Sequence, residues 1–276
     1  MITRIATALV VIAGLGLAEP PAGAFQEQTV EVAGKERRFR LLTPLASPQD
    51  APSPAPVILF LHGAGERGTD NLAQLKHFPE KMAQPEWRAK YRCFLIAPQC
   101  EPDKQWVDAP WGDKQSKPMA AEPSEMLRVA IATLEKVRAE HKAAIDPARI
   151  YVTGLSMGGY GTWELAMRHP EWFAAAAPIC GGGDEARAGR LASLPVWAFH
   201  GKDDTVVWPE RSERMVAAVT KAGGQAKLSL LPGVGHDAWS PAYDPKSGLL
   251  DWLFAQKRPA ARTGAGPLPT AGFCPA

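Results

Sequence analysis

Six short apolar segments, separated by segments with helical periodicity, constrain the fold of this chain more than any other feature. They are VILFLHG, CFLIAPQ, RIYVTG, FAAAAPI, PVWAFHG and KLSLLPG. Nearly continuous apolar runs of this length are typical of parallel strands that are buried on both faces of a sheet. Between them, residues 123–141 repeat apolar side chains along one helical face, and residues 209–224 begin with proline and end with two glycines. Strands that alternate with helices predict a doubly wound, mostly parallel α/β sheet.

Two further strand-like segments, TVEVAG and RRFRLLTP, precede these six and surround a turn at Gly34, so the sheet is expected to have about eight strands. With 276 residues, of which 46% are apolar, the chain is long enough for one large domain with a substantial core. The formal net charge of +2, without a run of like charges, gives no basis for a nucleic-acid or anionic-membrane partner. We therefore expect a small molecule or a neutral polymer as the partner, and the sequence leaves the oligomeric state open.

The two ends of the chain differ in composition from the rest. Arg4 precedes an apolar stretch over residues 5–17, and Ala22-Gly23-Ala24 follows it, which is the layout of a secretory signal. The alternative, a membrane anchor, needs about 20 apolar residues, more than this stretch provides. Residues 258–276 are rich in Pro, Gly and Ala and predict a flexible tail. We expect export to the periplasm or the medium, no membrane association after cleavage, and three parts: a signal peptide (1–24), a folded domain (25–257) and a tail (258–276).

Four cysteines, Cys93, Cys100, Cys180 and Cys274, are too few for a disulfide scaffold in a chain of this length. Cys93 and Cys100 bracket a predicted strand whose ends lie roughly 20 Å apart, too far for a bridge. Cys100 and Cys180 both follow strand-like segments with an Ala-Pro pair near the end, and whether they form a bridge stays open. No group of Cys and His residues has the spacing of metal ligands, so we expect neither a metal ion nor an organic cofactor.

One serine, Ser156, lies in the segment GLSMGG directly after a predicted strand. Glycines around a serine allow a sharp turn from strand into helix and lift the hydroxyl clear of the backbone. The hydroxyl then lies at a helix N-terminus, where N–H groups favour a developing oxyanion. Glycines at positions 158, 159 and 161 are expected to let the helix approach the sheet closely. The alternative is a set of glycines that serve only a tight turn, but the strand before the segment and the helical pattern after it favour a nucleophile.

A serine nucleophile needs a general base, and His236 is the strongest candidate among the six histidines. It follows the last predicted strand on a loop flanked by glycine, whereas His62 and His200 are expected to have structural roles in turns and the others to lie on the surface. Asp203 and Asp204, just after the preceding strand, are the candidate acids that would orient the imidazole. The chain order Ser, Asp, His is that of a catalytic triad on a sheet of this kind.

The segments HGAGERG, GLSMGG, HGKDDTVV and GHDAW together resemble those of the α/β-hydrolase superfamily. They are most similar to exported esterases and "predicted peptidases" related to dienelactone hydrolase and prolyl oligopeptidase, and the resemblance extends over residues 29–257. It implies the α/β-hydrolase fold, Asp204 as the acid with Asp203 as the fallback, and an oxyanion hole formed by the N–H groups of Ala64 and Met157. Dienelactone hydrolases use a cysteine where this chain has Ser156, which argues against that activity.

Segments around the expected site bear on the substrate. Only residues 180–193 are available for a lid after the strand that follows the nucleophile helix, too few for a large one, which predicts an open site and argues against an interfacial lipase. Trp106 and Trp111 are interpreted as substrate-binding residues that form an aromatic wall, or alternatively as packing residues. Glu66 and Arg67 are expected to form an ion pair that stabilises their loop, with substrate contact as the alternative.

These features predict an exported serine carboxylesterase with the triad Ser156, Asp204 and His236 that acts through an acyl-enzyme. Export and the short lid segment suggest feruloyl or acetyl esters on polysaccharide, or a polyester. A serine peptidase would use the same residues, although prolyl-peptidase relatives usually carry a large gating domain for which this chain has no room. An acyltransferase remains a further alternative. A non-catalytic binding protein is disfavoured because all three triad residues are present.

Overall fold

The computed structural model describes residues 24–45 and 53–259. The predicted signal peptide, apart from Ala24, and the predicted tail, apart from Arg258 and Pro259, lie outside these residues. The N–H of Arg258 donates a hydrogen bond to the carbonyl of Ala148, so the first residue of the predicted tail is attached to the domain.

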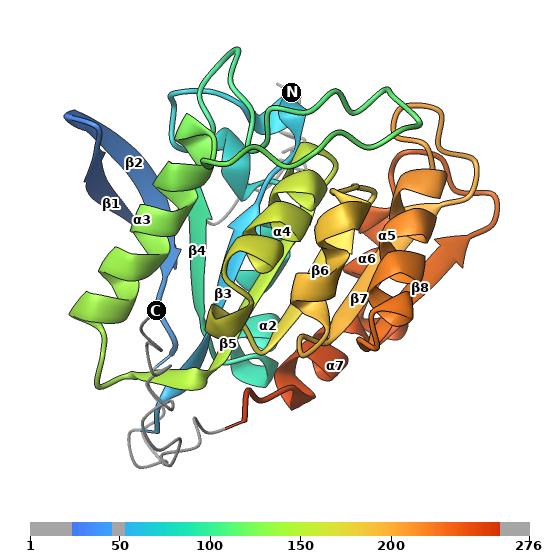
Figure 1. Ribbon diagram of the computed structural model, residues 1–276. Coiled ribbons are helices and arrows are strands. Elements are labelled where there is room, and N and C mark those ends of the chain that lie inside the picture. Colours follow the sequence, from blue (N-terminus) through green and yellow to red (C-terminus); the bar gives the residue numbers. More distant parts are fainter. Residues whose placement is uncertain (1–23, 46–52, 260–276) are drawn as a thin grey trace, which may run out of the picture.

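An eight-stranded sheet forms the centre of the molecule, in the order β1-β2-β4-β3-β5-β6-β7-β8 (Figure 1). β1 pairs antiparallel with β2, and β2 pairs antiparallel with β4, while the other neighbouring strands are parallel. The strands are β1 (Phe25–Val32), β2 (Lys35–Leu42), β3 (Ala55–Leu61), β4 (Phe94–Pro98), β5 (Ile145–Leu155), β6 (Ala175–Ile179), β7 (Val196–Gly201) and β8 (Ala226–Leu231). The doubly wound, mostly parallel sheet of about eight strands predicted from the sequence is confirmed.

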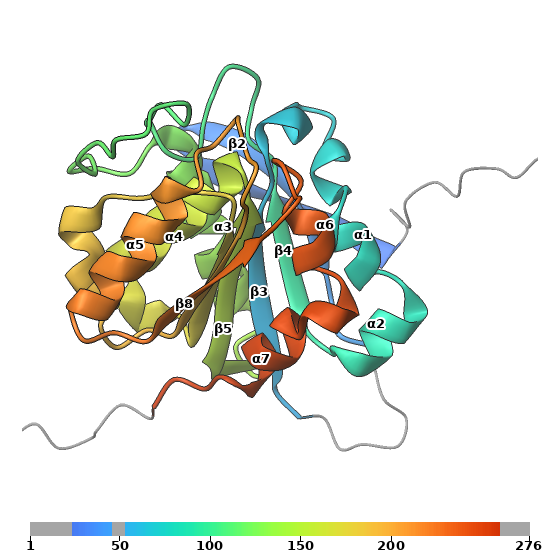
Figure 2. The same ribbon diagram turned by 90° about the vertical axis from the view of Figure 1, so that its right-hand side faces the viewer.

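Helices cover both faces of the sheet (Figures 1 and 2). One face carries α3 (Glu125–Glu140), α4 (Met157–Arg168) and α5 (Glu210–Lys221). The other face carries α1 (Phe78–Met82), α2 (Pro85–Lys90), α6 (Trp239–Ala242) and α7 (Leu249–Ala255). Short 3-10 helices lie in the connections: η2 (Ala64–Glu66), η3 (Ala73–Leu75), η4 (Pro170–Trp172), η5 (Glu185–Leu191) and η6 (Pro245–Ser247).

Each face of the sheet has its own hydrophobic core, because the central strands are apolar on both sides. Every residue of β3 is buried, and its side chains alternate between the two cores. The larger core lies beneath α3, α4 and α5, and the smaller one lies beneath α1, α6 and α7. Such two-sided burial is what the continuous apolar segments predict.

The structure also differs from the sequence-based expectation in its details. The last helix begins at Leu249, because Gly248 adopts a left-handed conformation with φ of 74° and separates α7 from η6. The helices α1 and α2 were not expected, since each is too short to show periodicity. Between β4 and α3 runs a connection without regular structure, residues 99–124, which we call the connecting loop.

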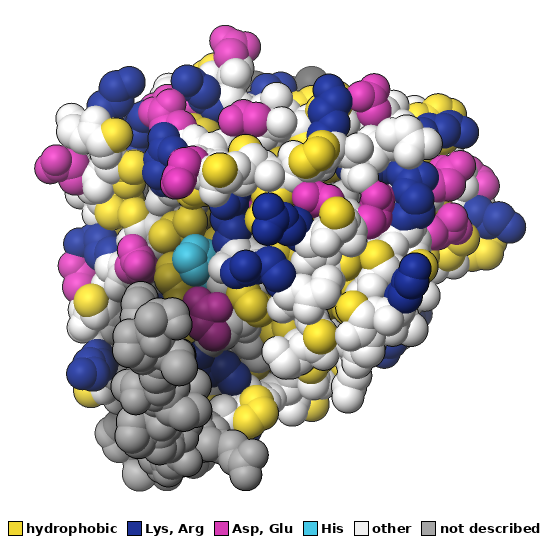
Figure 3. Space-filling view, viewed as in Figure 1, with side chains coloured by type: hydrophobic (Ala, Val, Ile, Leu, Met, Phe, Trp, Pro, Cys, Tyr) yellow, Lys and Arg dark blue, Asp and Glu magenta, His cyan; other side chains and the backbone are white. Residues whose placement is uncertain are grey.

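Surface features agree with the small net charge. On the face that carries α3, α4 and α5, Lys and Arg side chains alternate with Asp and Glu side chains rather than forming a patch of one sign (Figure 3). Among the described residues, no helix has the length and apolar content needed to cross a membrane.

Helix α4 lies directly against the backbone of β3, and glycine makes this approach possible. A Cβ atom built on Gly158 would lie 1.8 Å from the carbonyl oxygen of Leu61, and one on Gly159 would lie 2.3 Å from that of Ile179. Real Cβ atoms do not approach a backbone oxygen so closely, and neither carbonyl can move without displacing a central strand. The close approach expected from these glycines is therefore present.

Gly158→Ala is expected to lower the free energy of unfolding by about 3 kcal/mol or more, because the new methyl group must push α4 away from β3. Urea denaturation followed by circular dichroism measures the effect. Gly112→Ala is the matched control, because a Cβ at that position has no neighbour within 4 Å. A loss below about 1 kcal/mol at position 158 would contradict the close approach.

Candidate active site

Ser156 lies at the turn between β5 and α4, at the edge of the sheet where the parallel strands end. It adopts φ of 53° and ψ of −117°, a conformation that residues other than glycine rarely take and that costs about 1–3 kcal/mol. A hydrogen bond from its N–H to the carbonyl of Ile179, 3.0 Å long, helps to hold this strained turn. The turn leaves the Ser156 side chain half-buried, with its hydroxyl at the N-terminus of α4.

His236 and Asp204 approach Ser156 from two neighbouring loops. The Ser156 hydroxyl lies 2.8 Å from Nε2 of His236, and Nδ1 of His236 lies 2.7 Å from Oδ2 of Asp204. The imidazole can therefore accept a proton from the serine while its other nitrogen donates to the carboxylate. Asp203, the alternative acid, is exposed on the surface. The structure thus brings together the three residues that the sequence singled out.

Asp204 is buried, with 2% of its surface exposed, and it is held by more partners than the sequence indicated. Its Oδ1 accepts hydrogen bonds from the N–H groups of Val206 and Val207, at 2.8 and 3.0 Å. Burial by itself raises the pKa of a carboxyl group. Here the hydrogen bonds with His200 and His236, together with those two N–H groups, outweigh burial and hold the pKa of Asp204 well below its usual range. Asp204 is therefore a carboxylate at neutral pH.

His200 is the residue near the site that sequence reasoning missed. Its Nε2 lies 3.2 Å from Oδ2 of Asp204, so the carboxylate lies between two imidazoles. The same nitrogen lies 2.9 Å from the carbonyl of Val207, and Nδ1 lies 2.7 Å from the hydroxyl of Ser212. The expected structural role of His200 is present, but its contact with the acid could be inferred from no sequence signal other than a spacing of four residues.

Ala64 and Met157, the predicted oxyanion-hole residues, each begin a helix. Ala64 is the first residue of η2, after β3, and Met157 is the first residue of α4. None of the backbone hydrogen bonds found in the described part of the chain uses the N–H of either residue. Both donors are therefore available to an oxygen atom of a substrate.

The loop that carries Ala64 is held by His62, which had been expected to have a structural role. His62 is buried, and burial lowers its pKa to about 4, so the ring is neutral at pH 7. Its Nε2 accepts a hydrogen bond of 2.9 Å from the N–H of Cys100, and its Nδ1 lies 2.6 Å from the carbonyl of Gly63. The structural role is confirmed.

Glu66 and Arg67, in contrast, do not form the expected ion pair. Oε1 of Glu66 lies 3.5 Å from Nε2 of His77, which comes from the N-terminus of α1. Arg67 donates instead to the carbonyls of Ala64 and Lys104. That expectation was wrong because the loop folds back onto α1, a helix that the sequence did not reveal.

The two tryptophans predicted to bind substrate occupy different environments. Trp106 is fully buried, and its indole N–H donates to the carbonyl of His62 at 2.9 Å. It has no surface for a substrate, so the prediction is wrong for Trp106, and the packing alternative describes its position. Trp111 is half-buried in the connecting loop and stays a candidate. Trp239 packs edge-on against the ring of His236, with 5.4 Å between the ring centres.

Cys93, Cys100 and Cys180 are buried free thiols, so the bridge between Cys100 and Cys180 that the sequence left open is not formed. Cys274 lies outside the described residues. The donor atoms of Cys180, Asp204 and His236 lie within 4.8 Å of one another, the spacing of a metal site. However, burial raises the pKa of the Cys180 thiol, and the side chains of Asp204 and His236 are already hydrogen-bonded to each other. This donor set fits a hydrogen-bonded chain better than a metal centre.

The sheet, the strained serine turn and the adjoining histidine and aspartate define the protein as an α/β-hydrolase of the serine hydrolase class. Residues 45–243 match the model of the Phospholipase/Carboxylesterase family, and the chain belongs to that family.

Individual proteins support this assignment. A probable carboxylesterase of rice (Oryza sativa subsp. japonica) is 26% identical over 192 residues, which cover 65% of this chain and 80% of the rice protein. The crystal structure of a thermostable esterase, 38% identical, superposes with a TM-score of 0.76 over 86% of this chain, which spans 64% of that esterase. A poly(3-hydroxyalkanoate) depolymerase of Paucimonas lemoignei is 49% identical over 49 residues, 18% of this chain and 11% of the depolymerase.

Proposed function

We propose that the protein is a carboxylesterase that cleaves esters by means of Ser156, His236 and Asp204. The observation that carries this proposal is the continuous chain of hydrogen bonds from the serine hydroxyl through the imidazole to a buried carboxylate. A free hydroxyl is a weak nucleophile at neutral pH, and a base within hydrogen-bonding distance activates it. The family membership supports the same chemistry.

The mechanism is acyl transfer in two steps. His236 takes the proton of Ser156 as its oxygen attacks the ester carbonyl, and Asp204 stabilises the imidazolium that forms. The N–H groups of Ala64 and Met157 bind the negatively charged oxygen of the tetrahedral intermediate. His236 then protonates the leaving alcohol, and an acyl group remains on Ser156. A water molecule, activated by the same imidazole, releases the acid and restores the serine.

The substrate is an ester that reaches an open site. Between β6 and β7 the chain forms only the seven-residue η5, so this segment offers no large lid. An ester carried on a polymer fits such a site, and the local similarity to a poly(3-hydroxyalkanoate) depolymerase favours a polyester over a polysaccharide. We also propose that residues 1–24 direct export, which would place polymers outside the cell within reach. A mature N-terminus near Phe25, seen by intact mass, would support export.

A panel of p-nitrophenyl esters and peptide p-nitroanilides tests the proposed function. We expect cleavage of acetyl and butyryl esters with kcat/KM in the range of ordinary esterases, above about 10⁴ M⁻¹s⁻¹, and at least 100-fold slower cleavage of anilides. Comparable anilide cleavage would contradict an esterase and indicate a peptidase. If an added alcohol captured most of the acyl group in place of water, the protein would be an acyltransferase.

A further inference from the structure

A cavity of about 50 Å³ lies between the connecting loop and α4, and its lining on α4 extends from Tyr160, one helical turn beyond the candidate nucleophile, to Met167 near the end of the helix. Its lining includes Val107 and Met119 of the loop, Tyr160 of α4, Gly182, Asp184 and Arg211. A buried water needs a cavity of roughly 10–15 Å³, so this space suits a few waters or one small group such as a carboxylate. The distance along α4 from Ser156 to Tyr160 is about one turn, roughly 5–6 Å.

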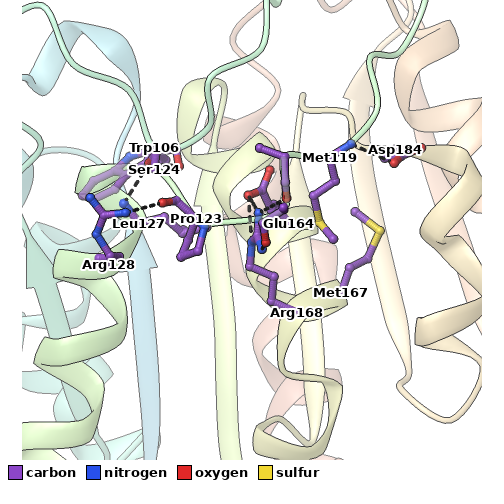
Figure 4. Close-up of polar contacts among 12 residues, drawn as sticks. Trp106, Met119, Pro123, Ser124, Leu127, Arg128, Glu164, Met167, Arg168 and Asp184 are labelled. Carbon is purple, nitrogen blue, oxygen red and sulfur yellow. Dashed lines mark hydrogen bonds and ion pairs between the residues drawn. The ribbon is translucent and has the colours of Figure 1, made fainter.

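The body of the protein holds the connecting loop over this cavity. Arg168 of α4 donates to the carbonyls of Ala120 and Ala121, at 2.7 and 3.0 Å. The N–H of Met119 donates to Asp184 at 2.8 Å, and Figure 4 shows this bond beside the pair of Arg168 and Glu164. The cavity is therefore a fixed feature of the fold and not a gap beneath an unattached loop.

Arg211, on the first turn of α5, is the unusual residue in the lining. It is 2% exposed, yet it is absent from the ion pairs formed within the described ranges. Its Nη1 donates to the carbonyl of Asp113 at 3.0 Å, and its Nε is buried without a hydrogen-bond partner. In contrast, Arg37, Arg168 and Arg214 each pair with a glutamate. A buried guanidinium without a counterion is costly, so a bound anion would stabilise it.

The remaining groups around Arg211 favour an anion as well. Its guanidinium lies 5.2 Å from the centre of the Tyr160 ring, which compensates only part of the buried charge. A Cβ on Gly182 would lie 2.9 Å from Cβ of Arg211, so only glycine lets the arginine occupy this place. Within the described chain, the N–H groups of Gly182 and Gly183 have no backbone acceptor, and both glycines line the cavity.

The acidic residues that line the cavity have other partners or lie in water. Glu164 pairs with Arg168, and the two oxygens of Asp184 accept from the N–H groups of Met119 and Ala186. Asp108 and Glu122 are exposed at the rim, as is Lys117 with the opposite charge. Arg211 is thus the buried cation of the cavity, and none of the ion pairs found among the described residues includes it.

We propose that this cavity binds a free carboxylate, with Arg211 as its main donor, and that the substrates of the site include esters whose acyl chain ends in a second acid group. This inference rests on the proposed esterase function. The carboxylate lies against Arg211 while the ester carbonyl lies at Ser156, and Arg211 selects such substrates without taking part in the reaction.

Paired substrates of equal chain length test the proposal. Mono-p-nitrophenyl glutarate, adipate and suberate carry the second carboxylate, and p-nitrophenyl valerate, hexanoate and octanoate lack it. Arg211→Met is expected to lower the ratio of kcat/KM for the charged ester to that for the neutral ester by about 10- to 100-fold for at least one chain length, the factor for a hydrogen bond to a charged group. Arg214→Met, one turn further on α5 and paired with Glu185, is the matched control and should leave the ratio unchanged.

A binding measurement separates this proposal from the proposed function. Glutarate should raise the melting temperature of the wild type and of Ser156→Ala but not of Arg211→Met, and Arg211→Gln, which also removes the charge, serves as the substitute if the methionine variant does not fold. If the Arg211 variants kept both the wild-type ratio of kcat/KM for charged to neutral esters and the wild-type stabilisation by glutarate, the carboxylate site would be overturned. Stabilisation by inorganic phosphate and not by glutarate would overturn the assignment to a carboxylate. If the wild type cleaved none of the esters but glutarate still raised its melting temperature, the proposed function would be refuted and the carboxylate site would remain supported.

Discussion

Ser156→Ala is expected to lower kcat for p-nitrophenyl butyrate by about 10⁴- to 10⁶-fold, because the acyl-enzyme can no longer form. The hydroxyl is the atom of the site that lies within reach of both the imidazole and an entering ester. Alanine keeps the backbone of the turn, so the circular dichroism spectrum should not change. Steady-state kinetics of the wild type and of Ser156→Ala measure the change in kcat. A fluorophosphonate label, followed by peptide mass spectrometry, should add its mass to the peptide that contains position 156 in the wild type only.

Two further variants make this result specific. Ser193→Ala, at an exposed position in the loop before β7, should keep wild-type kinetics. Ser156→Gly should be as inactive as Ser156→Ala but more stable by about 1–3 kcal/mol, because glycine adopts the observed φ of 53° without strain. Residual activity above about 1% of the wild type in Ser156→Ala would mean that the glycines around the serine serve only the turn.

Asp204→Asn is expected to lower kcat by about 10³- to 10⁴-fold with little change in KM. The carboxylate accepts the Nδ1–H of His236 at 2.7 Å and stabilises the imidazolium, whereas an amide carries no charge and can present its NH₂ group to the ring. Asp203→Asn, the neighbouring exposed aspartate, is the control and should change kcat by less than about twofold. If the loss of activity followed Asp203, the acid would have been assigned to the wrong residue.

The pH dependence of stability gives an independent check on Asp204. Its pKa is lower in the folded protein than in the unfolded chain, where it is about 3.9. The stabilisation from its hydrogen bonds is therefore fully present above about pH 4 and is lost as the pH falls through the lower, folded pKa. Asp204→Asn should flatten the acid side of the stability curve, as measured by urea denaturation between pH 2 and 6. A curve identical to that of the wild type would contradict the lowered pKa.

The sheet and the three residues of the candidate triad could be predicted because both follow from local patterns. Parallel strands end at the same edge of a sheet, so residues placed just after three of those strands must meet there whatever the details of packing. Ser156, Asp204 and His236 each follow such a strand. The helix α1 could not be predicted, since its five residues are too few for a periodic signal.

The partners of individual side chains were harder to predict. The sequence around Trp106 was as consistent with a substrate-binding residue as with a packing residue. In the structure its indole is buried and donates a hydrogen bond to the carbonyl of His62, 44 positions away in the chain. Glu66 contacts His77 and not its neighbour Arg67, because α1 approaches the loop from a different part of the fold. The contact partners of these side chains depend on how distant segments pack, and neither composition nor the spacing of residues predicts that packing.

The way in which the connecting loop is attached has a consequence for how this enzyme can change over generations. Tyr160, Trp208, Arg211 and Arg168 all donate to main-chain carbonyls of the loop, those of Trp111, Gly112, Asp113, Ala120 and Ala121. Every amino acid supplies the same carbonyl, so most side chains of the loop can be replaced without losing these bonds. Selection, or a designer with a loop library, can therefore vary these side chains while the loop stays attached to the domain through the same carbonyls.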